Sequence, residues 1–184
     1  TYVDDWYKNN ILNKKDSNNV SYSEYLTDKI FCNDRSLYRG DGYNLAVWSP
    51  YSPYNRTALL FTPSLTCSQT SDKFTTSSTL GNGKLTYPVG LITVDEVSLA
   101  GGKYRTNNDK YYLYTGKFWW TMSPYHFNNS NGKYHNFAVT STGELNAGYG
   151  YANSKVRPVL NLKSDILISS GSGTYYRPYI LKLN

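Results

Sequence analysis

The chain has 184 residues, of which 39% are hydrophobic and 17% are charged, and both shares lie below those of typical globular proteins. Tyr, Asn, Ser, Thr and Gly fill the difference, with Tyr alone present 20 times, a composition more typical of extracellular β-rich domains than of cytosolic enzymes. The net charge of +6 is interpreted as an aid to solubility, because Lys and Arg are scattered without the basic stripe of a nucleic-acid-binding protein. No run approaches the ~18 apolar residues of a membrane-spanning helix.

The length predicts one domain, residues 1–184, since domains usually have about 50–250 residues. The chain begins with Thr1 rather than Met, and its first residues do not resemble a signal peptide. We therefore expect an excised or processed piece of a longer protein, with any anchor or export signal outside it. The expected location is extracellular or at the cell surface.

The chain has two cysteines, Cys32 and Cys67, both in polar, turn-rich surroundings and neither in a C-x-x-C motif. A disulfide between them is the expected state, and two buried free thiols are the alternative. The bond would close a loop of roughly 35 residues.

In the N-terminal half, helical spacing of apolar residues predicts a helix over residues 3–12 and favours a second short one within residues 21–31. Residues 32–88 are mostly irregular, and Gly and Pro interrupt them repeatedly. Two short apolar patches, residues 45–48 and 58–61, are candidates for brief strands.

The clearest local signal covers residues 91–102. Thr93 and Glu96 form a capping-box pattern, in which each side chain accepts a hydrogen bond from a backbone N–H of the first helical turn. Gly101 and Gly102 then supply a C-terminal stop. A helix is predicted here.

From residue 110 onward the pattern predicts β-structure. Residues 137–145 alternate apolar and polar side chains around a turn at 141–143, which is typical of a hairpin. Further short strands are expected at residues 111–114, 118–122, 156–162, 166–168 and 179–183. With helices early and strands late, the sequence predicts an α+β domain with long structured loops.

A search for catalytic patterns finds none that is complete. His126 and His135 are nine residues apart, which fits no zinc motif, and no phosphate-binding or calcium-binding loop is present. No two carboxylates have a spacing that pairs them for glycoside hydrolysis; the candidates are Asp95, Glu96, Asp109, Glu144 and Asp165. We therefore expect no enzymatic activity, no cofactor and no metal.

Two segments, residues 125–136 and 146–153, combine Tyr, His and Phe with Asn, Ser and Gly. Antibody paratopes have this composition because Tyr offers area at low entropy cost and Asn, Ser and Gly offer adaptable hydrogen bonds. The alternative is that these segments are ordinary turns. The candidate ligand contacts are Tyr125, His126, Phe127, Asn129, Asn131, Tyr134, His135, Asn136, Asn146, Tyr149, Tyr151 and Asn153. The expected core residues are Trp119, Trp120, Phe137, Val156 and Leu160.

Residues 119–162 contain W-W-T-M-S-P, F-A-V-T-S-T-G-E-L and V-R-P-V-L-N-L, and the earlier chain contains D-D-W-Y-K-N-N, F-C-N-D-R-S and G-L-I-T-V-D-E-V-S-L-A-G-G. These pieces resemble a C-type-lectin-like domain of unknown function from surface proteins of gut bacteria. Lcl-like adhesin domains, formylglycine-generating-enzyme-like domains and the variable proteins of diversity-generating retroelements have a similar layout.

The resemblance implies two helices and a twisted antiparallel sheet whose C-terminal strands present a ligand surface. In the variable proteins that surface is diversified, and the residues at 125–153 are of the types such diversification produces. The calcium motifs of sugar-binding lectins are absent, so calcium-independent binding is expected. The catalytic cysteine pair of the formylglycine-generating enzymes has no counterpart near the C-terminus either.

Together these observations predict an adhesin-like or receptor-like module, at the cell surface or on a pilus, that binds a host or bacterial surface protein or glycan as a monomer. No contact with nucleic acid or membrane is expected from this piece. Two alternatives stay open: a carbohydrate-active enzyme or its accessory sugar-binding module, and a structural pilin-like subunit that self-associates.

Overall fold

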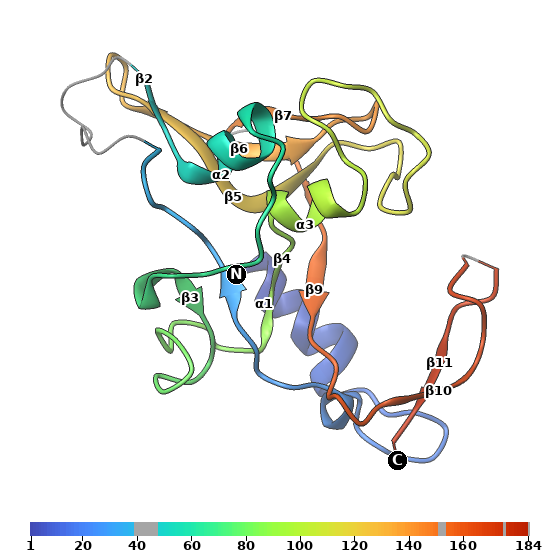
Figure 1. Cartoon of the computed structure of the whole chain (residues 1–184). Coiled ribbons are helices and arrows are strands. Elements are labelled where there is room, and N and C mark those ends of the chain that lie inside the picture. Colours follow the sequence, from blue (N-terminus) through green and yellow to red (C-terminus); the bar gives the residue numbers. More distant parts are fainter. Residues whose placement is uncertain (39–47, 151–153, 175, 184) are drawn as a thin grey trace.

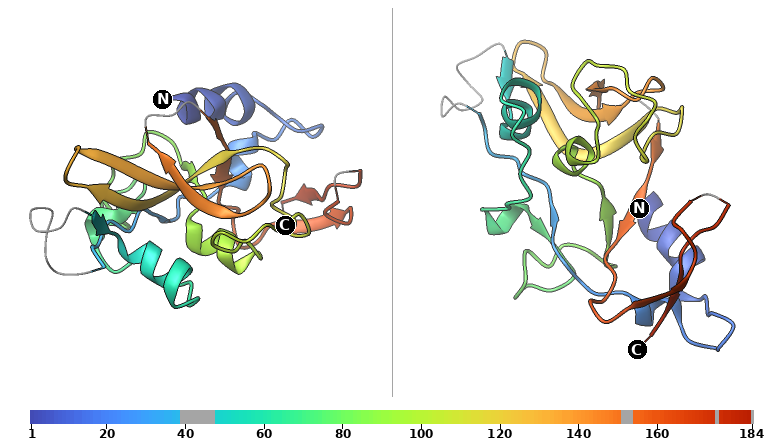
Figure 2. Two further views of the ribbon diagram at one scale, coloured as in Figure 1. Left: turned by 90° about the horizontal axis from the view of Figure 1, so that it is seen from above. Right: turned by 45° about the vertical axis from the view of Figure 1, so that its right-hand side comes forward.

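The computed structural model describes residues 1–38, 48–150, 154–174 and 176–183. Figure 1 shows the main sheet, β2, β5, β6 and β7, in the upper half, with the helices α2 and α3 beside it. The lower half holds α1 and two small strand pairs, and a C-terminal hairpin projects from it (Figures 1 and 2). The described part of the chain is thus α+β with mostly antiparallel strands, as the sequence predicted.

The helices predicted at residues 3–12 and 91–102 are both present. The helix α1 (Tyr2–Tyr7) continues as a π-helical segment (Lys8–Leu12), so the helix predicted at 3–12 is confirmed. The helix α3 (Val94–Leu99) carries the predicted capping box: the Thr93 hydroxyl accepts a hydrogen bond from the Glu96 N–H, and the Glu96 carboxylate accepts one from the Thr93 N–H. Among the described residues, none of the helices has the length and apolar character to cross a membrane.

Three local predictions are wrong. Residues 21–31 form only a 3₁₀ turn (Tyr22–Tyr25) before the strand β1 (Phe31–Cys32), so no α-helix lies there. Residues 58–61 are not a strand, because the helix α2 (Ser52–Tyr54) continues through them as a π-helical segment (Asn55–Leu59). Residues 111–114 form a turn instead of a strand. Of the candidate strand at 45–48, only Trp48 lies within the described residues.

The main sheet consists of β2 (Trp48–Pro50), β5 (Trp119–Asn128), β6 (Lys133–Val139) and β7 (Leu145–Tyr149) in spatial order, with β8 (Lys155–Val156) parallel to the start of β5. The hairpin predicted at 137–145 is confirmed as β6–β7. The strand predicted at 118–122 is confirmed as the start of a longer one, since β5 runs through Asn128.

Three two-stranded sheets complete the described fold. The strand β1 pairs with β3 (Lys73–Phe74), which follows a 3₁₀ turn (Thr70–Asp72), and β4 (Val89–Leu91) pairs with β9 (Pro158–Leu160). The predicted strands near the C-terminus are confirmed as a hairpin of β10 (Leu167–Ser170) and β11 (Ile180–Lys182). Beside β1, the predicted disulfide between Cys32 and Cys67 is present.

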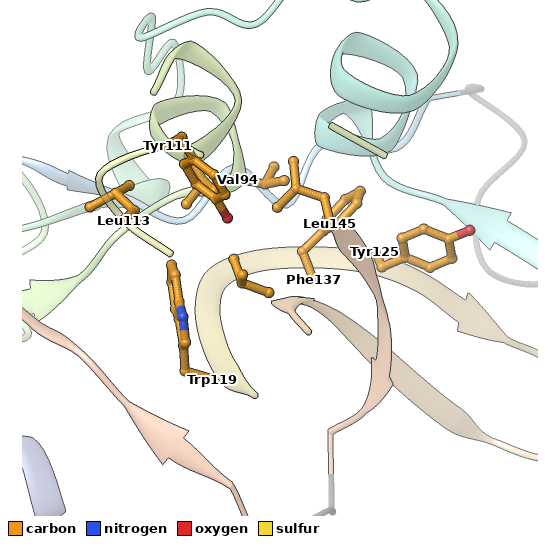
Figure 3. Packing of buried hydrophobic residues seen from close by; sticks show 9 residues of the cluster. Val94, Tyr111, Leu113, Trp119, Tyr125, Phe137 and Leu145 are labelled. Atoms are coloured by element: carbon orange, nitrogen blue, oxygen red, sulfur yellow. The ribbon is translucent and has the colours of Figure 1, made fainter. Parts of the chain in front are cut away.

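The hydrophobic core lies between α3 and the main sheet (Figure 3). Trp119, Trp120 and Phe137 are buried, as predicted. Val156 and Leu160 are only half-buried in the short strands β8 and β9, so their assignment to the core is corrected. The cluster consists of Val94, Val97, Tyr111, Leu113, Trp119, Tyr125, Phe137, Val139 and Leu145.

A partly buried ion-pair network fixes the segment after α2 against α3. The guanidinium of Arg56 contacts Asp34 at 2.6 Å and Asp95 at 2.9 Å. Asp95 also accepts a hydrogen bond from the Ser64 N–H. Because buried charges need partners, this network explains why an arginine and two aspartates are tolerated here.

Candidate functional site

A ladder of three rings crosses one face of the main sheet. His126 on β5 is paired with His135 on β6, and His135 is paired with Tyr149 on β7. Directly paired residues on neighbouring strands point to the same face, so the rings meet. The two imidazole centroids are 4.1 Å apart, and that of His135 is 4.5 Å from that of Tyr149.

A β-bulge adds Tyr125 to this face. The register steps from the pair Pro124–Asn136 directly to the pair His126–His135, so Tyr125 is an extra residue on β5. Bulges re-aim side chains in this way, and they are common next to functional sites. The Tyr125 ring packs 5.0 Å from the His126 ring, and its hydroxyl shares a 2.6 Å hydrogen bond with that of Tyr104.

Side chains from three other segments face the ladder. Trp48 begins β2, Tyr54 lies on α2, and Tyr104 follows α3. The Trp48 ring lies 5.1 Å from that of Tyr54 and 5.5 Å from that of His126. Together they enclose a hollow of about 440 Å³, which we call the aromatic hollow; it is lined by Trp48, Tyr54, Tyr104, Arg105, Tyr125, His126, His135, Ala147 and Tyr149.

Both imidazoles are neutral at physiological pH. His126 is 8% exposed, and burial, with a contribution from the nearby His135, lowers its pKa to about 4. Its Nδ1 atom is buried without a hydrogen-bond partner among the described residues. Burial and the charge of Lys133 also lower the pKa of His135. A neutral imidazole both donates and accepts hydrogen bonds, so His135 can serve a polar ligand either way.

The tyrosine hydroxyls are held protonated. Burial raises the pKa of Tyr125, and the hydrogen bond to Tyr104 adds to this effect. Burial also raises the pKa of Tyr54. The positive charge of Arg105 opposes the rise of the pKa at both hydroxyls.

Of the residues predicted as ligand contacts, the structure brings Tyr125, His126, His135 and Tyr149 together around the aromatic hollow. They lie on strands and not on loops, so that part of the prediction is wrong. Tyr125 is 5% exposed and belongs to the hydrophobic core, which corrects its assignment to an exposed surface. His126 is likewise buried and lies on the floor of the hollow.

Phe127 and Tyr134 are paired with each other one position further along β5 and β6. Side chains alternate between the two faces of a strand, so this pair lies on the face opposite the His126–His135 pair. The Tyr134 ring packs over Gly150, where a Cβ atom would lie only 1.9 Å from it. The predicted contacts are therefore divided between two faces of the sheet.

Three of the predicted asparagines form hydrogen bonds within the protein, two of them with near neighbours in the sequence. Asn129 donates to the Ser49 hydroxyl, the Asn131 side-chain oxygen accepts from the Lys133 N–H, and Asn146 donates to the Glu144 carboxylate. The alternative of ordinary turn residues fits Asn131 best, because this is how Asn stabilises a turn. Asn136 is half-buried on β6. Tyr151 and Asn153 lie outside the described residues.

Sequence reasoning did not find Trp48, Tyr54, Tyr104 or Arg105, which complete the site. Trp48 and Tyr54 precede His126 by more than 70 positions, and Tyr104 and Arg105 follow a helix stop without any motif. No local pattern marks them, because tertiary structure brings them to the hollow. Trp48 arrives through the pairing of β2 with β5, and the others through the packing of α2 and of the segment after α3 beside the sheet.

Four of the five carboxylates considered for catalysis, Asp95, Glu96, Asp109 and Glu144, have structural partners. Arg56 binds Asp95, and Glu96 belongs to the capping box of α3. Asp109 lies 3.4 Å from its neighbour Lys110 on the surface. Within the described ranges, no three His, Cys, Asp or Glu side chains form a group that could hold a metal ion.

No protein-family model, curated protein or solved structure matches this chain. What the aromatic hollow can do follows from its chemistry. Aromatic faces stack on flat apolar surfaces, and neutral imidazole and phenol groups form hydrogen bonds with polar ones. Such a site is equipped to hold a small amphipathic ligand.

Proposed function

We propose that the chain is a calcium-independent ligand-binding domain of an extracellular or cell-surface protein, adhesin-like or receptor-like, and that its ligand binds in the aromatic hollow. The ligand is part of a host or bacterial surface protein or glycan. The observation that carries the proposal is the convergence of six aromatic or imidazole side chains from β2, α2, β5, β6 and β7 on one cavity, namely Trp48, Tyr54, Tyr125, His126, His135 and Tyr149.

The size and lining of the hollow support binding. Ligand sites are concave, usually enclose about 300–1,000 Å³ and combine apolar walls with a few convergent polar groups. The aromatic hollow has about 440 Å³. Trp48 and Tyr149 remain 39% and 49% exposed at the two outer strands of the path β2-β5-β6-β7, so large aromatic surface is available to a ligand.

The disulfide supports an extracellular setting, because such bonds persist mainly in oxidising compartments. Calcium independence is supported by the described lining of the hollow, which contains no Asp or Glu to coordinate the ion. For the fold we propose the C-type-lectin-like type, supported by the short helices, the bulged antiparallel sheet and the long loops that the resemblance leads one to expect.

Two tyrosines provide a matched test. Tyr149 lines the hollow and is 49% exposed, whereas Tyr134 is 50% exposed and lies on the opposite face of the sheet. The purified domain, Tyr149→Ala and Tyr134→Ala are applied to glycan and surface-protein arrays with and without a calcium chelator. We expect binding that survives chelation, that Tyr149→Ala weakens by about tenfold or more, and that Tyr134→Ala retains.

The melting temperatures of both variants are measured alongside, so that loss of structure is not mistaken for loss of binding. Binding that is lost equally in both variants, or only in Tyr134→Ala, would move the ligand away from the hollow. A domain that binds nothing on either array would contradict the proposed function.

A further inference from the structure

The two charged side chains that the structure places at the aromatic hollow, Arg105 and Lys133, are positive. Among the described residues that line it, Arg105 is charged and none is Asp or Glu. A second cation lies at its edge, where the Lys133 ammonium is 5.8 Å from the centroid of the Tyr149 ring. A cavity whose nearest charges have one sign favours a ligand of the opposite sign.

Arg105 differs from the arginines that stabilise the fold. Arg35 and Arg56 pair with aspartates, and Arg157 donates a hydrogen bond to the Leu113 carbonyl while it lies over Trp119. Arg105 forms no ion pair with any carboxylate of the described residues. Its side chain is exposed, and its guanidinium lies 5.1 Å from the centroid of the Tyr104 ring.

That stacking orients the guanidinium without using its hydrogen-bond donors. A guanidinium over an aromatic face is held by the cation–π interaction, while its N–H groups lie around the edge of the plane. Those donors can therefore bind a carboxylate with two parallel hydrogen bonds.

The backbone also holds Arg105 in an unusual conformation. Its φ is +49°, a left-handed value that costs free energy for any residue with a Cβ atom. The strain is maintained by a tight turn, in which Lys103 bridges to Thr106 and the Arg105 N–H donates to the Leu145 carbonyl at 2.9 Å. Strained residues of this kind concentrate at binding sites, where the surrounding structure presets the side chain.

The rest of the hollow suits a sugar ring. Trp48 and Tyr149 offer exposed aromatic faces to the C–H surface of a pyranose, and neutral imidazole and phenol groups offer hydrogen bonds to its hydroxyls. One guanidinium satisfies a carboxylate, whereas phosphate sites gather several donors, often at a helix N-terminus.

We infer that the aromatic hollow selects sugars that carry a carboxylate and that Arg105 binds this group. This inference rests on the proposed function. Uronic acids and sialic acids share this chemistry. The inference goes beyond binding in general, because it assigns the charged part of the ligand to one residue.

The test compares sugars that differ only in the acid group. Methyl β-D-glucuronide and methyl β-D-glucoside are titrated into the wild-type domain and followed by NMR chemical-shift changes. A sialylated trisaccharide and the same trisaccharide with its carboxylate converted to a methyl ester form the second pair, and glucose 6-phosphate is a further anionic control. We expect the acidic member of at least one pair to bind about tenfold more tightly than its neutral counterpart; the pair that responds identifies the source of the acid.

Arg105→Asn removes the charge and suits the left-handed backbone, since Asn adopts positive φ more readily than most residues. In this variant we expect the preference for the acid to fall to near parity, with an unchanged melting temperature. Arg105→Lys is expected to keep part of the preference, because it retains the charge but not the paired donors.

Equal binding of acidic and neutral sugars by the wild type, an undiminished preference in Arg105→Asn, or tighter binding of the phosphate would each overturn the inference. None of these outcomes tests the proposed function itself. That function is tested by the comparison of Tyr149→Ala with Tyr134→Ala, whose result does not depend on whether the ligand carries an acid group. The two ideas can therefore fail separately.

Discussion

His126 illustrates how a single side chain can be both part of the fold and part of the site. It is nearly buried, yet its ring forms the floor of the aromatic hollow between Trp48 and His135. Truncating such a residue removes packing as well as a ligand contact. Its role is better tested by a change that retains the ring and removes only the titration.

The lowered pKa of His126 makes the stability of the domain depend on pH. The folded-state pKa of about 4 lies below the unperturbed value of about 6.5, so between these values the unfolded chain binds a proton that the folded one does not. Stability due to this group is therefore complete above about pH 7 and is lost as the pH falls toward 4, by at most about 3 kcal/mol. The lowered pKa of His135 adds a loss of the same sign.

The free energy of unfolding of the wild type, measured with urea, should be lower at pH 5 than at pH 7.5. In His126→Phe, which keeps a planar ring in the stack, the fall should be much smaller. The ion-paired Asp34 has a pKa below its usual value and stays charged at pH 5. Its titration therefore does not contribute to the difference in stability between pH 7.5 and pH 5. An equal fall in both proteins would show that another group is responsible.

Among the secondary-structure elements, α3 was predictable because its signals are local. Thr93, Glu96 and Gly101 each act within one helical turn, and Gly101 adopts φ +112° at the stop. The strand predicted at residues 111–114 was wrong for a physical reason. Tyr111 and Leu113 are buried and Tyr112 is 81% exposed, which is the alternation of a strand without any partner strand beside it.

The bulge at Tyr125 could not be predicted either. A regular strand would place Tyr125 and His126 on opposite faces. Pro124, which cannot donate to the ladder, marks an irregularity in residues 119–128, but it does not say which residue is the extra one. The aromatic composition of the segment therefore indicated a site, whereas the split of its residues between two faces depends on register. Register is decided by pairing with β6, which the sequence of β5 alone does not contain.

The capping box of α3 offers a test at the level of one helix. Thr93→Ala removes a hydroxyl that accepts the Glu96 N–H and donates to the Glu96 carboxylate. We expect it to lower the free energy of unfolding by about 1 kcal/mol. Thr93→Ser, which keeps the hydroxyl, is the matched control and should lose much less; similar losses in both variants would point to packing of the methyl group instead.

For the chain as a whole, the disulfide constrains the lower half of the molecule. Cys32 and Cys67 are 35 positions apart and join β1 to the loop before β3. Closing such a loop restricts the unfolded chain and should contribute roughly 3–4 kcal/mol. The bond was predictable from sequence because two cysteines leave only one pairing.

The double variant Cys32→Ser, Cys67→Ser should accordingly unfold at a lower urea concentration than the wild type. Reduction of the wild type with dithiothreitol should reproduce that loss, since it opens the same loop without changing a side chain elsewhere. A double variant as stable as the oxidised wild type would show that the loop is already ordered by its other contacts.

The pairing of distant strands determines the order in which the chain can fold. The strand β4 has its partner β9 about 70 positions later, and Leu26 bridges to Leu162. As the chain is synthesised, the Cys32–Cys67 loop and β1–β3 can close early, whereas β4 keeps an open edge until residue 160 has emerged. Topologies dominated by such distant contacts fold in milliseconds to seconds, so this edge is exposed to mispairing in the nascent chain.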